Sequence, residues 1–521
     1  MSTNIFKQRS NQTFLLLFLY VLFLFLRAPD ILIQGRFWAE EGNIFYTNAY
    51  NMHPLHAFFV VYGGYINLGA SGATLITRFL HIPLEYAPYV TTFIGFFFQI
   101  LPIYLLLTAK DNWLAPFHVR LIATSLLLFV PESSEISLQS LHIQFHLTLA
   151  CAFIAFLKTD TRSQRWFKLT LLFFAPLCGL LPIILLPIYL IQFVNEKNQQ
   201  RFEQFLALLL GSLIQISFYL YNAKYNIDLN STTIARQGHF SLTDLCSTIY
   251  VRDLVFPFLG HRYDVIIKFI AKTYYELQAH HLFIPAFILF GLFIIIALVC
   301  VIKYSKLRKL FIISITTFFI VFIIVYGVIG ETILFVKPYY LNSFETSMII
   351  MADIFHHLEL KQIPIKACVI ASLFVIFIAS IFILYPLTRK SFILFLTALL
   401  TLSLAVYGVI GGTIQLVNPY FTERYTFLSQ ALFAIMALYF SVTLPKTGKI
   451  ITNIVIFWLL IVGSVNFFQL LPEAKDGGGH VWKQELQKWQ QNPNYHPKIW
   501  SSGWFIIVPQ QFSSSIHSTE Q

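Results

Sequence analysis

The stretch that decides the fold is FLLLFLYVLFLFL, from Phe14 to Leu26, and an acidic sequence, FWAEEG, follows it at residues 37–42. Apolar runs approaching the ~20 residues needed to cross a bilayer recur along the whole chain. Hydrophobic residues make up 57% of the chain and charged residues only 11%, with a mean hydropathy of +0.70, whereas soluble proteins carry about 25% charged residues. The sequence therefore predicts an all-α, polytopic bundle of transmembrane helices.

We expect about 13 spans from the apolar runs. They lie near 14–33, 86–108, 117–131, 143–157, 169–181, 182–194, 203–221, 281–302, 310–335, 365–386, 391–411, 425–443 and 450–471. Pro176, Pro182 and Pro187 interrupt the pair at 169–194. That pair could be two short half-spans or one re-entrant hairpin. Lys7 and Arg9 precede the first run and no small-residue cleavage site follows it, which predicts an uncleaved signal anchor.

The basic residues orient the chain. The net charge is +11, but these residues are dispersed between spans, so we exclude nucleic acid as a partner. The positive-inside rule places the N-terminus in the cytoplasm and, with an odd number of spans, the C-terminus outside. The loops expected on the inner face hold Lys158, Arg162, Arg165, Lys168, Lys197, Arg201, Lys303, Lys306, Arg308, Lys309, Arg389, Lys390, Lys446 and Lys449.

This orientation divides the chain into four parts. A transmembrane module, 1–221, carries the first outer loop, 34–85; an outer amphipathic loop follows at 222–280; a second module covers 281–471; and a short outer cap covers 472–521. We expect juxtamembrane amphipathic helices in the outer loops, 337–364 included. Segment 308–341 is repeated at 389–422 with a constant offset of 81 residues, and we interpret this repeat first as shared packing through its glycines.

The adjacent carboxylates Glu40 and Glu41 are the first candidate site. A carboxylate just outside the bilayer can act as general base on an acceptor hydroxyl. It can also hold a divalent cation, Mg or Mn, against a phosphate. The simpler interpretation is a solvated loop anchored by Trp38. We favour a functional pair, with Glu41 as the base and Glu40 orienting the acceptor or binding the cation.

Other candidates follow on the same expected face. Gly63 and Gly64 permit a tight turn before Tyr65, and Arg78 could bind an anionic headgroup or only extend its side chain to lipid phosphate. Glu135 precedes His142 and His146, which share a helix face; metal binding and the polar lining of an outer cavity both remain open, and no third ligand is evident.

Arg424 and Tyr425 open a late span on the outer face. A guanidinium there can bind a lipid phosphate through two parallel hydrogen bonds, which lysine cannot do. No Walker A loop and no GxSxG motif occur, so ATP-driven transport and soluble-type hydrolysis are unsupported.

Together these residues resemble the type C integral-membrane glycosyltransferases, and more closely a bacterial group with a W-A-E-D-G motif after its first span. Here that motif is Trp38-Ala39-Glu40-Glu41-Gly42. Further similar elements are Gly64-Tyr65 with Arg78, Glu135 through His142 and Phe145, Gly179-Leu180-Leu181-Pro182 through Pro187, Arg424-Tyr425, and Ser501-Ser502-Gly503-Trp504. The chain departs from the pattern at Glu41 (usually Asp), His142 (usually Asn) and Ser501 (usually Pro).

The resemblance implies a glycosyltransferase of a bacterial inner membrane that moves a hexosyl or pentosyl unit from a polyprenyl-phosphate donor to a glycan, lipid or protein acceptor on the outer face. It implies that Arg424, Tyr425, Arg78, Tyr65, Glu135 and His142 contact the substrate or its lipid phosphate. One alternative is a lipid-linked polysaccharide polymerase or ligase, which would rely more on outer Arg and His. The other is a lipid or solute transporter or flippase, although the expected spans hold few ionisable residues for ion coupling.

Overall fold

The computed structural model describes residues 2–158, 162–225, 227–228, 240, 245, 248–249, 252–253, 256–260, 389–409, 423–444, 446–468, 481–500 and 503–508. The chain divides into two compact units. The first comprises 1–236, 390–405 and 422–521, and the second comprises 237–389 and 406–421. Most described residues, and every residue of the candidate site below, belong to the first unit. Within the second unit the structure describes short pieces, including the helix α13 (Phe256–Leu259).

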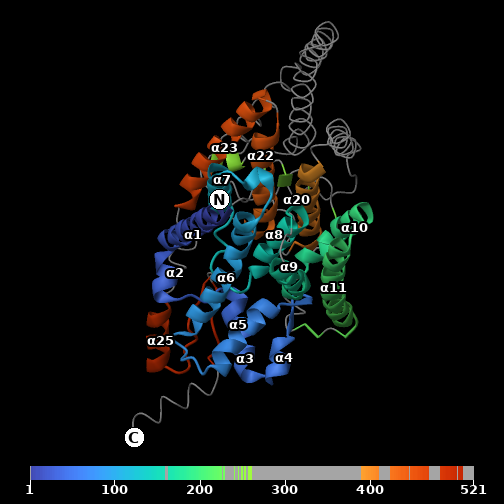
Figure 1. The fold of residues 1–521 in the computed structure, drawn as a ribbon. Coiled ribbons are helices and arrows are strands. Elements are labelled where there is room, and N and C mark those ends of the chain that lie inside the picture. Colours follow the sequence, from blue (N-terminus) through green and yellow to red (C-terminus); the bar gives the residue numbers. More distant parts are fainter. Residues whose placement is uncertain are drawn as a thin grey trace, which may run out of the picture. The chain divides into compact units, whose positions relative to one another are not determined.

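The chain is mostly helical (Figure 1). The longer helices are α1 (Ser2–Arg27), α5 (Leu68–Phe79), α6 (Ala87–Thr108), α7 (Phe117–Leu128), α8 (Ile143–Phe156), α9 (Arg162–Phe174), α10 (Leu186–Glu196), α11 (Gln199–Tyr225), α20 (Arg389–Gly408), α22 (Phe427–Thr443), α23 (Lys446–Phe467) and α25 (Trp482–Gln491). The short helices are α2 (Pro29–Gln34), η1 (Glu41–Tyr46), α3 (Thr47–Asn51), α4 (Pro54–Phe58), η2 (Asn112–Leu114), η3 (Ala175–Cys178), η4 (Leu181–Leu185) and η9 (Glu423–Tyr425).

Three of the described helices are long and apolar enough to cross a membrane: α1 over Arg9–Arg27, α6 and α11. Shorter apolar helices cover Phe117–Leu128, Ile143–Phe156, Leu181–Glu196, Ile393–Gly408, Phe427–Thr443 and Thr452–Phe467. Large apolar side chains such as Phe14, Phe93 and Phe457 remain about two-thirds or more exposed, as expected where lipid is the solvent. The chain is a helical protein with the composition of a multi-pass membrane protein.

Most described helices coincide with predicted spans, but α1 begins and ends earlier than the run predicted at 14–33, and the pair predicted at 169–194 also differs. There α9 ends at Phe174, earlier than expected, and two 3₁₀ turns, η3 and η4, lead into α10. Pro176 and Pro182 lie at the starts of these turns, because proline cannot donate the backbone hydrogen bond that a continuing helix needs. The predicted spans at 281–302, 310–335 and 365–386, the first copy of the repeat and most of the 222–280 loop lie outside the described residues.

The segment 34–85, which we expect to be the first outer loop, is built from short helices and one hairpin, a departure from the all-α expectation. β1 (Val61–Tyr62) pairs antiparallel with β2 (Tyr65–Ile66). Gly63 and Gly64 form the turn with φ angles of 63° and 89°, which L-residues with a Cβ adopt only at a steric cost. The structure therefore confirms the tight turn predicted at these glycines.

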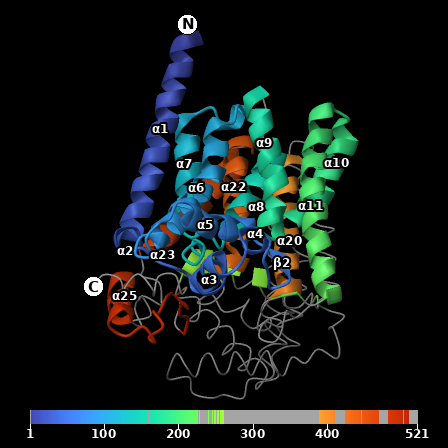
Figure 2. The ribbon, with the colours of Figure 1, turned by 90° about the horizontal axis from the view of Figure 1, so that it is seen from below.

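The C-terminal tail packs against the first outer loop. Trp482, Leu486 and Trp489 of α25 share one buried cluster with Phe37 and Tyr46 of that loop. Asn43 Nδ2 donates to the Phe505 carbonyl over 2.6 Å. The elements of the first loop and α25 gather at one end of the long helices of this unit (Figure 2).

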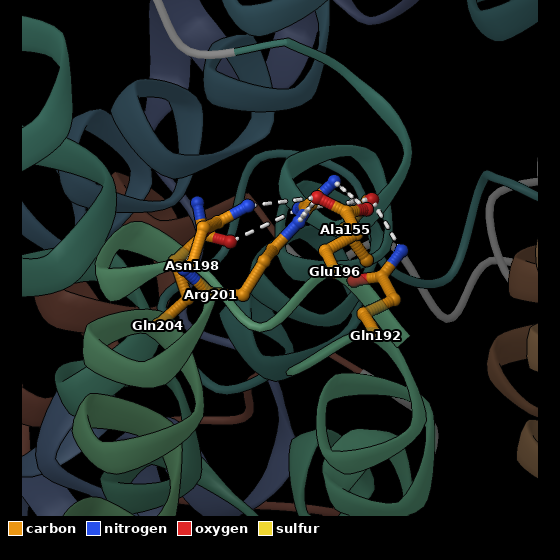
Figure 3. Close-up of polar contacts among 6 residues, drawn as sticks. All are labelled: Ala155, Gln192, Glu196, Asn198, Arg201 and Gln204. Carbon is orange, nitrogen blue, oxygen red and sulfur yellow. Dashed lines mark hydrogen bonds and ion pairs between the residues drawn. The ribbon is translucent and has the colours of Figure 1, made fainter. Parts of the chain in front are cut away.

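A polar cluster joins α8, α10 and α11 (Figure 3). Arg201 makes a two-pronged ion pair with Glu196, Nε to Oε2 over 3.0 Å and Nη2 to Oε1 over 3.1 Å. The same guanidinium lies 3.4 Å from the carbonyl oxygen of Ala155 in the last turn of α8, and Gln192 Nε2 donates to that oxygen over 2.7 Å. A cation at a helix C-terminus is stabilised by the helix dipole, so Arg201 fixes the α10–α11 turn to the end of α8.

We expect Arg201→Ala to lower the free energy of unfolding by about 1–2 kcal/mol, because a buried carbonyl and a carboxylate both lose their cation. Thermal unfolding in detergent measures this loss. Arg165→Ala is the matched control, since Arg165 pairs with Glu203 but is 36% exposed, against 14% for Arg201, and exposed pairs contribute about 0–1 kcal/mol. Equal losses in the two variants would contradict the role given to Arg201.

Candidate functional site

The acidic motif is held by the C-terminal tail and by an unusual helix. Trp38 forms a parallel bridge with Trp500, and the Trp500 N–H donates to the Phe37 carbonyl over 3.2 Å. Ala39 then takes a φ of 37°, rare for a residue with a side chain. Glu41 opens η1, a π-helix of six residues, a form that occurs frequently at functional sites. The local backbone thus presents the two glutamates in different directions.

Glu41 points into the protein and is fully buried. Its Oε1 accepts hydrogen bonds from the Ser140 backbone N–H over 2.8 Å and from the Ser140 hydroxyl over 2.6 Å, and its Oε2 accepts one from the Trp38 N–H over 3.2 Å. Burial raises the pKa of Glu41, against the opposing effects of Ser140, Trp38 and the Arg36 charge. Glu41 therefore fastens the first outer loop to the loop at 132–142.

Glu40 differs because it is partly exposed. Burial is the largest cause that raises its pKa, and the nearby carboxylate of Glu135 raises it further. The positive charge of Arg424 and a hydrogen bond with the Tyr62 side chain act in the opposite direction. Glu40 and Arg424, 384 positions apart in the sequence, therefore lie within electrostatic range of each other.

Two carboxylates join the 132–142 loop to the start of α22 in a reciprocal manner. Glu135 binds the Arg424 guanidinium through Oε1 and accepts the Arg424 backbone N–H through Oε2 over 3.1 Å. Glu423 Oε2 accepts the N–H groups of Ser134 and Glu135, over 2.9 and 3.1 Å, and also the Ser134 hydroxyl. Each segment thus supplies a carboxylate for the backbone of the other. We call this arrangement the reciprocal clamp.

The reciprocal clamp shifts the pKa values of Glu135 and Arg424. Burial alone would raise the pKa of Glu135, but Arg424 and His142 outweigh it, so this pKa is lowered. Burial opposes the charge on Arg424, but Glu135, Tyr425 and Glu40 outweigh it, and the pKa of Arg424 is raised. Arg424 and Glu135 are therefore both ionised at neutral pH.

Further contacts hold the same loop from other helices. Glu132, fully buried, accepts from the Thr426 hydroxyl and from Gln430 Nε2 over 2.6 Å at the start of α22. Arg27 at the end of α1 donates to the Ser133 hydroxyl over 2.8 Å. Arg36 donates to the Ser137 carbonyl over 2.9 Å, and its guanidinium carbon lies 4.9 Å from the centre of the Trp38 ring. Side chains from three other parts of the chain therefore hold this loop.

The two histidines lie inside this arrangement rather than on its surface. His142 Nδ1 is 3.3 Å from the Glu135 carbonyl oxygen, and His146 Nε2 is 3.2 Å from that of Ile136. Burial lowers the pKa of His142 to about 4, despite the opposing charge of Glu135, so His142 is neutral at physiological pH. Among the residues that the structure describes, no group of three or more His, Cys, Asp or Glu is arranged to hold a metal, so the geometry gives the predicted cation no defined ligand set.

The remaining predicted residues are Tyr425, Tyr65 and Arg78. Tyr425 lies beside Arg424, whose guanidinium carbon is 5.0 Å from the Tyr425 ring centre. Tyr65 lies in β2, where Gln144 Nε2 donates to its hydroxyl over 3.4 Å. Arg78 donates to the carbonyl oxygens of Ala49 and Met52, both over 2.7 Å, at the end of α3. Arg78 therefore binds the backbone at the end of α3, and in the described part of the chain it forms no hydrogen bond or ion pair with Arg424 or Glu40.

Three residues that position the site, Ser140, Glu132 and Glu423, had no predicted role. Ser140, Glu132 and Glu423 each bind a side chain or backbone group distant in sequence. The sequence could have indicated a role for Glu423, because this residue directly precedes the predicted site residue Arg424. It could not have done so for Ser140, because only the folded chain brings its N–H and hydroxyl to Glu41.

No protein-family model matches the chain, and no curated protein and no solved structure matches it either.

The clamp makes a prediction about stability and pH. Because the pKa of Glu135 lies below its ordinary 4.5, its pairing stabilises the fold above that pH and is lost as the pH falls through the lowered value. We expect Glu135→Gln to lower the free energy of unfolding at pH 7 by about 1.5–3 kcal/mol, and the difference from wild type to shrink below pH 4.5. Denaturant unfolding at several pH values measures it. Glu196→Gln, at a 45% exposed carboxylate, is the control; a deficit independent of pH would contradict the assignment.

Proposed function

We propose that the chain is a membrane glycosyltransferase of the type C kind, which transfers a sugar from a polyprenyl-phosphate donor to an acceptor hydroxyl on the outer face of the membrane. The observation that carries the proposal is that a partly exposed carboxylate, Glu40, lies within electrostatic range of a guanidinium, Arg424, 384 positions away in the sequence. A base and an anion-binding group are the two functions that such a transfer requires.

Glu40 is the proposed general base, in place of the role first expected for Glu41. All three hydrogen bonds to Glu41 come from the protein itself, and its side chain has no exposure to an acceptor. Glu40 is partly exposed, unlike Glu41, and its raised pKa makes it a better proton acceptor than an ordinary carboxylate. Glu41 is instead a positioning residue that fixes the direction of Glu40 through Ser140.

Arg424 is the proposed ligand of the donor phosphate. In the reaction the acceptor oxygen forms a bond to the anomeric carbon, and the bond from that carbon to the phosphate oxygen breaks. The acceptor proton passes to Glu40, and the negative charge develops on the polyprenyl phosphate, where Arg424 stabilises it. Attack from the face opposite the phosphate inverts the anomeric centre. Tyr425 lies against Arg424 and restricts its position.

The membrane arrangement is part of the same proposal. We infer about 13 spans with the N-terminus in the cytoplasm, which puts the acidic motif and the reciprocal clamp on the outer side. Ile76, Phe79 and Leu80 at the end of α5 are exposed, which supports a juxtamembrane position for this helix. The acceptor, glycan, lipid or protein, would approach Glu40 from the aqueous side.

Glu40→Gln should affect activity, whereas Glu41→Gln should affect stability. Glu40→Gln removes an accessible base, so we expect a normal melting temperature and loss of sugar transfer. Glu41→Gln places an amide NH₂ or a weaker acceptor against donors from Ser140 and Trp38, so we expect a lower melting temperature, with a free-energy loss of about 1–3 kcal/mol. Transfer from a synthetic polyprenyl-phosphate sugar and thermal unfolding measure the two effects. Full activity of folded Glu40→Gln protein would overturn the assignment of the base.

Two substitutions test Arg424: glutamine removes its charge, and lysine keeps the charge but lacks the planar guanidinium. Arg424→Gln should lower the transfer rate by about 10²–10³-fold, as loss of a transition-state donor does, and Arg424→Lys should retain part of it because the charge remains. Since Arg424 lowers the pKa of Glu40, the residual activity of Arg424→Gln should also be lost at a higher pH than that of wild type. If activity falls at the same acidic pH in Arg424→Gln and in wild type, Arg424 does not influence the pKa of Glu40.

The polymerase or ligase alternative gives a different pattern. Such an enzyme would depend on His142 as a polar group facing the substrate, whereas here His142 contacts the Glu135 backbone. His142→Gln retains a hydrogen-bonding side chain and should leave most transfer activity in place. If His142→Gln abolishes activity in a folded protein and Glu40→Gln does not, the alternative is favoured.

A further inference from the structure

Helices α7, α22 and α23 pack against one another (Figure 1). A cleft of about 400 Å³ lies between them. It is lined by Val119, Ile122, Leu438, Ile456 and Leu460, and its polar lining includes His118 and Lys449. The reciprocal clamp adjoins the first residues of α22, whereas the cleft adjoins the last ones. Since α22 has 17 residues, or about 25 Å of helix, the two sites lie at opposite ends of it.

The helices around this cleft carry basic charges, and the nearby carboxylate of Asp111, which precedes η2, is paired with Lys390. Helices α1, α7, α22 and α23 contain no Asp or Glu. Their basic residues with described side chains away from the clamp are Arg9, Arg120, Lys446 and Lys449. Arg120 is buried and donates to the neutral side chains of Gln12 and Thr13. A cluster of cations without carboxylates on the same helices attracts an anion.

The surroundings of the cleft are those of a surface in contact with lipid. Ile450, Ile454, Phe457 and Trp458 of α23 are exposed and apolar, as are positions along α1 such as Phe14 and Phe18. An apolar recess beside such a surface, with cations at one end, has the chemistry of an acyl chain joined to an anionic headgroup. A soluble anion would use the cations and leave the apolar walls in contact with water.

We propose that this cleft is a binding site for an anionic phospholipid, with one acyl chain between α7, α22 and α23 and the phosphate at His118 and Lys449. Its placement in the inner leaflet follows from the orientation proposed above, but binding itself does not depend on the transferase activity. Lys446, exposed at the start of α23, adds attraction for the headgroup.

The test is lipid retention by the full-length protein. The protein is purified in mild detergent from nanodiscs that contain equal phosphatidylglycerol and phosphatidylcholine with the same acyl chains, and the retained lipids are quantified. Wild type should be enriched in phosphatidylglycerol. Lys449→Gln should reduce this enrichment about fivefold, and His118→Gln with Lys449→Gln should reduce it further. Val442→Phe, which fills part of the cleft, should reduce retention of both lipids.

The control is Lys197→Asn, which removes a basic residue of the same expected face in the α10–α11 turn. Lys197 has a φ of 46°, which asparagine tolerates well. It should leave retention unchanged. No enrichment in wild type, an equal loss in Lys197→Asn, or displacement of the lipid by glycerol phosphate that lacks acyl chains would overturn the proposal. Lys449 is exposed, so its variant decides the test even if Val442→Phe does not fold.

Discussion

The structure of the candidate site depends on buried carboxylates that accept hydrogen bonds from backbone N–H groups and pair with one guanidinium. A buried charge is costly unless it is paired and hydrogen bonded. Here Glu135 holds Arg424, and Glu423 holds the backbone that presents Glu135. Because each segment satisfies the polar groups of the other, neither can move without exposing an unpaired charge to the protein interior. The constraint fixes the beginning of α22 to the end of α7.

The same constraint explains why one of two adjacent glutamates is available for chemistry. Glu41 is drawn inward by Ser140, which belongs to the loop that the clamp holds. Glu40, the residue before Glu41, is partly exposed and lies within electrostatic range of Arg424. The tail closes the arrangement from the other side, since Trp500 pairs with the backbone at Trp38. A carboxylate and a guanidinium are thereby held apart from direct pairing with each other, and Arg424 keeps Glu135 as its partner.

Much of the helical framework could be predicted from the sequence, because spans follow from apolar length alone. The predicted run at 86–108 corresponds to α6, and that at 143–157 to α8. The candidate site could be predicted only in part. Glu40, Glu41, Glu135 and Arg424 were identifiable as polar residues beside spans. Their contacts with Ser140 and Glu423 were not, because these contacts exist only after folding, and neither were the hydrogen bonds from Arg78 to the carbonyl oxygens of Ala49 and Met52.

The most direct test of this account is the proximity and sidedness of Glu40 and Arg424. Each would be replaced by cysteine, alone and together, in a chain whose five native cysteines are replaced by serine or alanine. Impermeant thiol reagents applied from either side of sealed vesicles report the face, and a short bifunctional thiol reagent reports proximity. The account predicts labelling of both positions from the outer side and an intramolecular cross-link in the double variant. Labelling from opposite sides, or no cross-link in a folded double variant, would contradict it.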